Sequence, residues 1–164
     1  MENIQIHKVT ANDAEFLHKL MNDEHVIDRL SETETGIDIW ISAIIEWEKD
    51  QDEEDYIIYY NSIAIGWLGI NNLLSADKKA YIKMIVILPE YQGRGIGKYV
   101  ISQSVEHLRL MGYHSVILFT DNSNVVAQKC YKKCGFDITE TIMKKMSNGK
   151  SIKRVKMEKV LKCY

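Results

Sequence analysis

The residues that most clearly suggest a chemical function lie between positions 84 and 98, where an apolar run leads into a glycine-rich turn. Ile85–Leu88 is rich in β-branched residues, and glycines then alternate at Gly93, Gly95 and Gly97 before a helical pattern begins. A strand, a glycine turn and a helix start together place unpaired backbone N–H groups at the positive end of a helix dipole. The segment therefore predicts a binding site for a pyrophosphate or a similar anion.

Glycine suits such a site for two reasons. Any side chain in the turn would hold an anion away from the backbone, and some turn positions require the positive φ that glycine adopts readily. Arg94 and Lys98 add positive charge beside the turn. A tight strand-to-helix turn that binds no ligand would use the same glycines, so their spacing has to be compared with known phosphate motifs.

The spacing excludes two common phosphate-binding motifs. A P-loop ends in Gly-Lys-Ser/Thr, whereas here Gly97 and Lys98 are followed by Tyr99. The dinucleotide fingerprint G-x-G-x-x-G is absent as well, because the chain reads G-x-G-x-G. The order Gln92-x-x-Gly95-x-Gly97 instead resembles the pyrophosphate-binding motif Q/R-x-x-G-x-G/A of the GNAT superfamily, the acyl-CoA N-acyltransferases.

A second segment strengthens this resemblance. Residues 115–120 read as a buried strand, and the stretch after it is similar to the GNAT pattern N-x-x-A-x-x-x-Y-x-x-x-G-F. The matching residues are Asn124, Ala127, Tyr131, Gly135 and Phe136. The two segments stand in the order and at roughly the separation found in the family. The resemblance covers about residues 80–160 well and the N-terminal half in outline.

The resemblance implies an α/β (α+β) fold in one domain over residues 1–164. A mixed, mostly antiparallel sheet of six to seven strands is expected, flanked by about four helices. In the family, two parallel central strands, here at about 79–88 and 115–120, splay apart and admit the thioester arm. Hydrophobic periodicity and turn residues predict the other elements: strands at about 4–9, 56–60, 63–70, 136–145 and 151–160, and helices at about 12–22, 36–49, from the glycine turn to 111, and 124–134.

Two local features accompany these elements. The acidic stretch 23–34 is predicted to be irregular. Thr35, with Asp38 three residues later, resembles a cap for the helix at about 36–49.

The resemblance also implies roles for particular residues. The backbone of the strand before the turn would hold the pantetheine arm and donate to the oxyanion, and the turn would bind the pyrophosphate. Tyr131 occupies the position of the general acid, and a phenol with a pKa of ~10 can protonate a departing thiolate; its alternative role is core packing. Asn124 would contact the pantetheine or the substrate, or simply begin a helix. The expected cofactor-binding residues are Ile85, Val86, Ile87, Gln92, Gly93, Arg94, Gly95, Ile96, Gly97, Lys98 and Asn124.

No general base is assigned. Many family members carry a glutamate on one of the two splayed strands, but residues 81–85 and 117–120 contain no carboxylate, and Phe119 stands where some members have Glu. An alkyl ammonium has a pKa of ~10.4, so a proton must still be removed from it at neutral pH. A water chain, Glu32 and Glu34 remain open as alternatives.

Composition limits the class of protein. Hydrophobic residues make up 46% and charged residues 27% of the chain, as in ordinary soluble domains. No apolar run approaches the ~18 residues of a membrane span, and the net charge of −2 argues against general nucleic-acid binding. The three cysteines and five histidines show no metal-ligand spacing. We expect a cytoplasmic protein with no metal, no membrane contact and no nucleic acid.

The two halves of the chain differ in charge. In residues 22–55 every charged residue is acidic except Arg29 and Lys49, whereas residues 129–162 are rich in lysine. An acidic early half could attract a cationic substrate, although a solvated surface would look the same.

The resulting hypothesis is an N-acetyltransferase that uses acetyl-CoA as co-substrate and moves the acetyl group to a primary amine by direct attack. The acceptor would be a small cationic amine or a protein or peptide amine. An acyl-CoA-binding sensor with the same fold but little turnover is the alternative, and a homodimer is left open.

Overall fold

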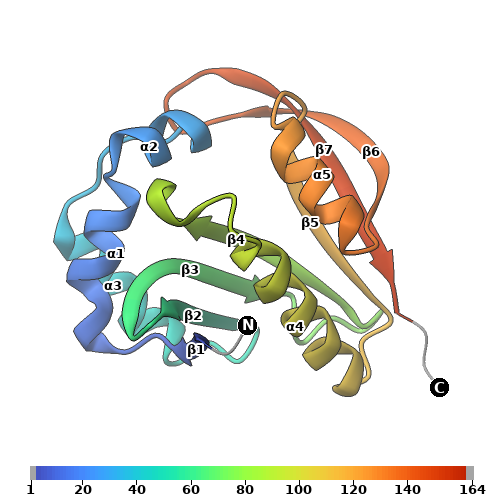
Figure 1. Cartoon of the computed structure of the whole chain (residues 1–164), viewed down its shortest axis with the longest axis horizontal. Coiled ribbons are helices and arrows are strands. Elements are labelled where there is room, and N and C mark those ends of the chain that lie inside the picture. Colours follow the sequence, from blue (N-terminus) through green and yellow to red (C-terminus); the bar gives the residue numbers. More distant parts are fainter. Residues whose placement is uncertain (1–2, 162–164) are drawn as a thin grey trace.

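The computed structural model describes residues 3–161 and contains one seven-stranded sheet in the order β1-β2-β3-β4-β5-β7-β6 (Figure 1). Hairpins join β2 to β3 and β6 to β7, as the turn residues predict. The strands are β1 (Ile4–Lys8), β2 (Glu53–Tyr60), β3 (Ile63–Asn71), β4 (Lys79–Ile87), β5 (Ser115–Asp121), β6 (Asp137–Lys145) and β7 (Ser151–Val160).

The neighbouring strands β4 and β5 are parallel, and all other paired neighbours are antiparallel. Their pairing covers only the first residues of each strand, from Lys79 with Ser115 to Ile82 with Leu118. A register shift between β3 and β4 places Lys83 at a bulge just beyond this point. The two strands then diverge (Figure 1), so the mixed sheet with two splayed parallel strands is confirmed.

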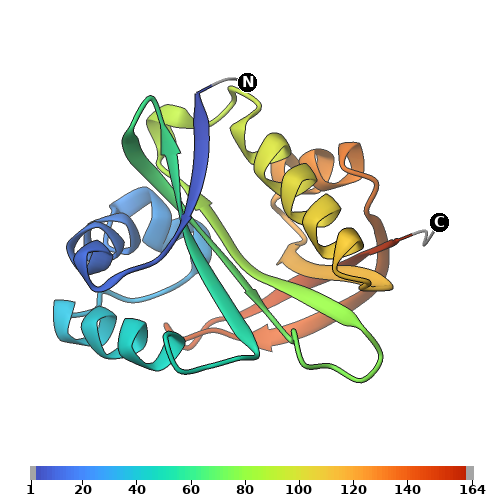
Figure 2. The same cartoon turned by 90° about the horizontal axis from the view of Figure 1, so that it is seen from below.

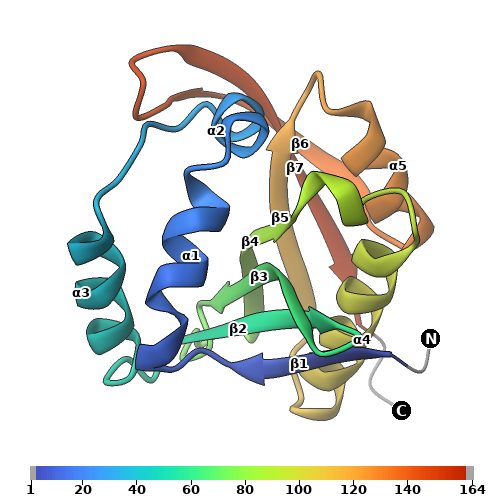
Figure 3. The ribbon, with the colours of Figure 1, turned by 60° about the vertical axis from the view of Figure 1, so that its left-hand side comes forward.

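The helices form two groups, one on each face of the sheet (Figure 2 and Figure 3). One apolar core joins the sheet to α4 and α5, and a second joins it to α1, α2 and α3. Ile96, Val100 and Leu108 recur at helical spacing on the buried side of α4. The helices are α1 (Ala14–Met21), α2 (Glu24–Leu30), α3 (Ile37–Trp47), α4 (Ile96–Leu110) and α5 (Val125–Lys133).

Helix α2 corrects the prediction that residues 23–34 are irregular. Asp23 caps it by accepting hydrogen bonds from the N–H groups of His25 and Val26, and the helix ends at Ser31 in a left-handed conformation. Val26 is its one buried residue. Two turns with a single buried position are too short for periodicity to reveal, so the cap was the only sequence signal.

The predicted cap of α3 is also wrong. Gly36 is the N-cap residue, with no side-chain cap hydrogen bond. The Thr35 hydroxyl instead accepts a hydrogen bond from Trp40 Nε1 at 2.9 Å. Thr35 therefore fixes a core side chain rather than the helix terminus.

A charged cluster lies beneath the bulge on the α3 side of the sheet. The Lys83 ammonium contacts the carboxylate of Glu53, lies 3.2 Å from Asp55 Oδ2 and sits 4.6 Å from the centre of the Trp47 ring. Trp67 Nε1 donates to the other Asp55 oxygen at 2.7 Å. Burial raises the pKa of Asp55 to about 7 and lowers the pKa of Lys83 to about 8. Burial thus works against both charges, and the 3.2 Å ion pair between the two groups favours their charged forms.

Replacing Lys83 by Met should lower the free energy of unfolding at pH 7.5 by about 3 kcal/mol, because it leaves Asp55 buried without a countercharge. Adding Asp55→Asn should recover part of this loss. Denaturant unfolding measures both effects. Lys79→Met is the matched control, because Lys79 is also on β4 but its partly exposed pair with Glu158 spans 3.5 Å; it should cost less than about 1 kcal/mol. Equal losses for the two lysines would contradict a special role for the buried cluster.

Candidate active site

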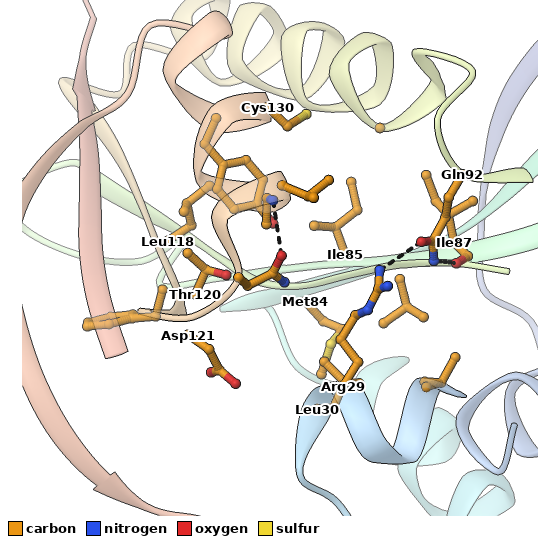
Figure 4. Close-up of a pocket in the computed structure, with 18 of the residues that line it drawn as sticks. Arg29, Leu30, Met84, Ile85, Ile87, Gln92, Leu118, Thr120, Asp121 and Cys130 are labelled. Carbon is orange, nitrogen blue, oxygen red and sulfur yellow. Dashed lines mark hydrogen bonds between the residues drawn. The ribbon is translucent and has the colours of Figure 1, made fainter. Parts of the chain in front are cut away.

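A cleft of about 1160 Å³ follows the gap between β4 and β5 and is lined by both strands. The turn after β4, α5, α2 and the β6–β7 hairpin provide the rest of its walls (Figure 4). This volume slightly exceeds that of pockets for drug-sized ligands. The cleft therefore has room for a cofactor and part of a second molecule.

The glycine turn forms one end of the cleft and has the predicted backbone geometry. Gly93 and Gly95 have φ values of 73° and 80°, and Gly95 is the N-cap residue of α4. Gly97 follows in the first turn of the helix and lines the cleft. The first N–H groups of α4 have no partner within the helix. Together with the helix dipole they can bind an anion at this point.

Gln92 ties the turn to two other elements. Its Nε2 donates to the carbonyl of Ile87 at 2.7 Å, and its Oε1 accepts from Arg29 Nη1 on α2 at 2.7 Å (Figure 4). Gln92 therefore fixes the turn against the end of β4. The contact with Arg29 spans 63 positions of sequence, and no local pattern could have revealed it.

The side chains of the two basic residues near the turn point in different directions. Lys98 lines the cleft. Arg94 turns away: its Nη2 donates to the carbonyl of Glu90 at 2.8 Å, and its guanidinium lies 5.3 Å from the centre of the Tyr91 ring. In this arrangement Arg94 supports the turn from outside the cleft.

The backbone of β4 forms one long wall of the cleft. Ile85, Val86 and Ile87 pair with β3 along one edge of the strand. The other edge faces the gap, because the pairing with β5 ends at Ile82. Backbone N–H and C=O groups on an unpaired strand edge can bind an extended ligand. These three residues and Ile96 line the cleft, and their predicted contact with a cofactor stays a prediction.

Asn124 and Tyr131 approach the cleft from α5. Asn124 is the N-cap residue, and its Oδ1 accepts a hydrogen bond from the N–H of Ala127 at 3.1 Å. Tyr131 packs against Phe136, with ring centres 6.4 Å apart, and also lines the cleft. Both residues thus combine a structural role with access to the site. Burial raises the pKa of Tyr131, so its phenol keeps a proton that it can donate.

The β5 side of the gap holds Phe119, where some family members carry Glu, and two residues that no sequence pattern marked, Asp121 and Arg154. Strand β5 continues one residue further than predicted, to Asp121, whose carboxylate lies 3.5 Å from Arg154 Nε. Phe119 contacts Tyr81 edge to face at 5.7 Å, and the Arg154 guanidinium lies 5.9 Å from the Phe119 ring centre.

Most of the acidic segment 22–55 lies away from the cleft. Asp28 and Glu32 line it, whereas Glu34 does not. The Ser147 hydroxyl in the β6–β7 turn donates to the Glu32 carboxylate, which joins α2 to the hairpin. The acidic contribution to the site is therefore smaller than the sequence suggests.

Within residues 3–161, no group of three or more His, Cys, Asp and Glu side chains is arranged to hold a metal ion. Over the same range no helix combines the length and apolarity that crossing a bilayer requires.

A comparison with protein families agrees with this site, which combines a glycine turn, a strand gap and Tyr131. The model of the acetyltransferase (GNAT) family matches residues 15–136. The chain therefore belongs to the GNAT family of acetyltransferases.

Curated relatives match part of the chain. An uncharacterised N-acetyltransferase of Methanocaldococcus jannaschii is 28% identical over 108 residues, which are 63% of this chain and 48% of that protein. The mycothiol acetyltransferase of Pseudarthrobacter chlorophenolicus is 34% identical over 55 residues, or 34% of this chain and 17% of that protein. The matches thus span about half or less of these relatives.

Solved structures match nearly the whole chain. The spermidine N-acetyltransferase of Vibrio cholerae, in complex with CoA and spermine, has a TM-score of 0.87 at 19% identity and covers 98% of this chain and 96% of its own. The microcin C7 self-immunity acetyltransferase, in complex with acetyl-CoA and AMP, has a TM-score of 0.85 at 20% identity and covers 98% and 94%. At these identities the likeness concerns the fold.

Proposed function

We propose that this protein transfers an acetyl group from acetyl-CoA to a primary amine by direct attack of the amine on the thioester. One observation carries the proposal: the edge of β4 beyond Ile82, which is not paired with β5, lines the same cleft as the glycine turn and the partly buried Tyr131. This sequence of groups corresponds to a pyrophosphate, an extended arm and a thiol in one ligand. The CoA and acetyl-CoA bound to the two solved relatives support it.

Each group would contribute one part of the reaction. The N–H groups of Gly93–Lys98 would bind the pyrophosphate, and the gap-facing edge of Ile85–Ile87 would hydrogen-bond the pantetheine arm. A backbone N–H on the same edge would donate to the oxyanion that forms when the amine adds to the carbonyl. Tyr131 would protonate the departing sulfur.

The acceptor would enter from the α2 side of the gap. Asp28 and Glu32 line that side and can attract an ammonium group. The aromatic rings of Tyr81 and Phe119 can contact a cation through their faces. The spermine in the complex of the Vibrio cholerae spermidine N-acetyltransferase is an amine of this chemical type. A small amine with more than one positive charge is therefore the acceptor we propose.

The direct test is thiol release from acetyl-CoA in the presence of a panel of amines: polyamines, amino sugars, amino acids and N-terminal peptides. Amine-dependent release, with an acetylated product confirmed by mass spectrometry, is the expected result. CoA binding without release across the whole panel would contradict the proposal and favour a sensor.

Acetyl-CoA or CoA should raise the melting temperature, because a ligand that binds only the folded state stabilises it by mass action. Gly95→Asp should abolish this shift by placing a carboxylate in the anion site. Gly112→Asp is the matched control, because Gly112 has a similar φ of 84° beyond the other end of α4 and does not line the cleft. It should carry the same backbone strain and keep the shift. A full shift in Gly95→Asp would remove the assigned pyrophosphate site.

Tyr131→Phe should lower kcat by about 10²-fold or more, the usual scale for a lost general acid. The ring and its packing on Phe136 remain, so the melting shift with CoA should persist. Steady-state kinetics with the best amine of the panel measures the effect. Turnover within a few-fold of wild type would make Tyr131 a packing residue.

Salt should depress kcat/KM more for a polycationic amine than for a monoamine of similar length, because the Debye length falls from ~10 Å at 0.1 M to ~3 Å at 1 M. Asp28→Asn with Glu32→Gln should reproduce part of that loss at low salt. Glu34→Gln is the control, since Glu34 is exposed outside the cleft. Equal salt sensitivity for both amines would show that these carboxylates do not select the acceptor.

A further inference from the structure

Asp121 is the last residue of β5, at the point where the strand has separated from β4. Side chains alternate between the faces of a strand. Leu118 and Thr120 are buried, with Leu118 in the core shared with α4 and α5, so Phe119 and Asp121 point to the other face. In Figure 4 the Asp121 carboxylate points away from Cys130 on α5.

Tyr131 lies on the opposite side of the gap. It comes from α5 and packs against the core that α4 and α5 share with the sheet. Both Tyr131 and Asp121 line the cleft. A carboxylate and a phenol thus approach the same gap from opposite faces of the sheet.

Resting on the proposed function, we infer that Asp121 is the general base that removes a proton from the acceptor ammonium on the face opposite Tyr131. The amine approaches one face of the planar thioester carbonyl, whereas the departing sulfur lies in that plane. The amine and the sulfur therefore need separate proton-transfer groups, and the gap presents one from each face.

The surroundings of Asp121 suit a base. Its side chain is 21% exposed, so solvent reaches it from the cleft only in part. Burial raises the pKa of its carboxyl, and the facing Arg154, its cross-strand partner, lowers that pKa in turn. A carboxylate with a raised pKa accepts a proton more readily than an exposed one.

The other carboxylates of the cleft are placed less well. Asp28 is exposed on α2, and Glu32 accepts a hydrogen bond from Ser147. Neither belongs to the two strands that bound the gap. Besides Arg154, the basic and acidic side chains that line the cleft are His25, Asp28, Arg29, Glu32, Lys83, Lys98, Lys129, Lys133 and Lys144.

Atoms and protons balance in the proposed acetyl transfer. Asp121 takes one proton from R–NH3+, and the free amine forms a C–N bond to the carbonyl carbon. The tetrahedral intermediate then breaks its C–S bond while Tyr131 gives its proton to the thiolate. The nitrogen loses its second proton, which restores Tyr131 through solvent, and Asp121 releases its proton to water. The products are the N-acetyl amine, CoA-SH and one proton.

The test measures the pH dependence of kcat/KM with the best amine acceptor. The kcat/KM of the wild type should rise with pH along an acidic limb and then level off once Asp121 is ionised. Asp121→Asn should lower kcat by at least about 100-fold. Its residual activity should climb steadily toward the pKa of the free amine, ~10.4, because only amine that is already neutral reacts.

Two further variants separate a chemical role from a structural one. Asp121→Glu should recover part of the activity and restore the acidic limb. Arg154→Gln should move that limb to higher pH by about one unit or more, because the guanidinium holds the Asp121 pKa down. Asp137→Asn is the control for the substitution itself, since Asp137 is exposed at the start of β6, outside the cleft.

The outcomes are distinguishable. Near-wild-type turnover in Asp121→Asn, or an acidic limb unchanged in Arg154→Gln, would overturn the inference and leave the proposed function standing. A wild-type chain that acetylates no amine would overturn both. The CoA-induced melting shift should persist in Asp121→Asn, and its loss would reassign Asp121 to cofactor binding.

Discussion

The structure depends on one constraint: two parallel central strands pair at their beginnings and then separate. Beyond Ile82 and Leu118, β4 and β5 no longer share hydrogen bonds. Unpaired backbone groups inside a protein are costly unless another partner satisfies them. The antiparallel pairing of β4 with β3 and of β5 with β7 holds both strands from their outer edges. The rest of the sheet therefore keeps the gap open, and a ligand in the gap can supply hydrogen-bond partners for the free strand edges.

The surrounding elements organise this gap into a site with two different faces. The α4–α5 face brings the helix N-terminus and Tyr131, which suit an anion and a leaving thiol. The other face brings α2, Arg154 and Asp121, which suit an incoming amine. Two contacts between distant segments hold the rim of the cleft: Arg29 on α2 donates to Gln92 in the glycine turn, and Ser147 in the β6–β7 turn donates to Glu32 after α2.

The sequence predicted the elements that have strong local patterns. The glycine turn, the seven strands and α1, α3, α4 and α5 follow from periodicity and turn residues, and the residues of the turn were expected at the site. Helix α2 escaped because only Val26 is buried in it. No sequence pattern predicts Asp121, Arg154 and Arg29 at the site, because their roles depend on contacts between segments that are distant in the sequence. Arg94 carries the right charge in the right motif, yet its guanidinium folds back on Glu90 and Tyr91.

The most direct test of the gap as the thioester site is a crystal structure with an unreactive acetyl-CoA analogue in which a methylene group replaces the thioester sulfur. We expect the pyrophosphate on the N–H groups of Gly93–Lys98 and the pantetheine arm along the free edge of Ile85–Ile87. The carbonyl of the analogue should lie between Tyr131 and Asp121. An arm that runs outside the gap, or a β5 strand that closes onto β4 in the complex, would contradict this expectation.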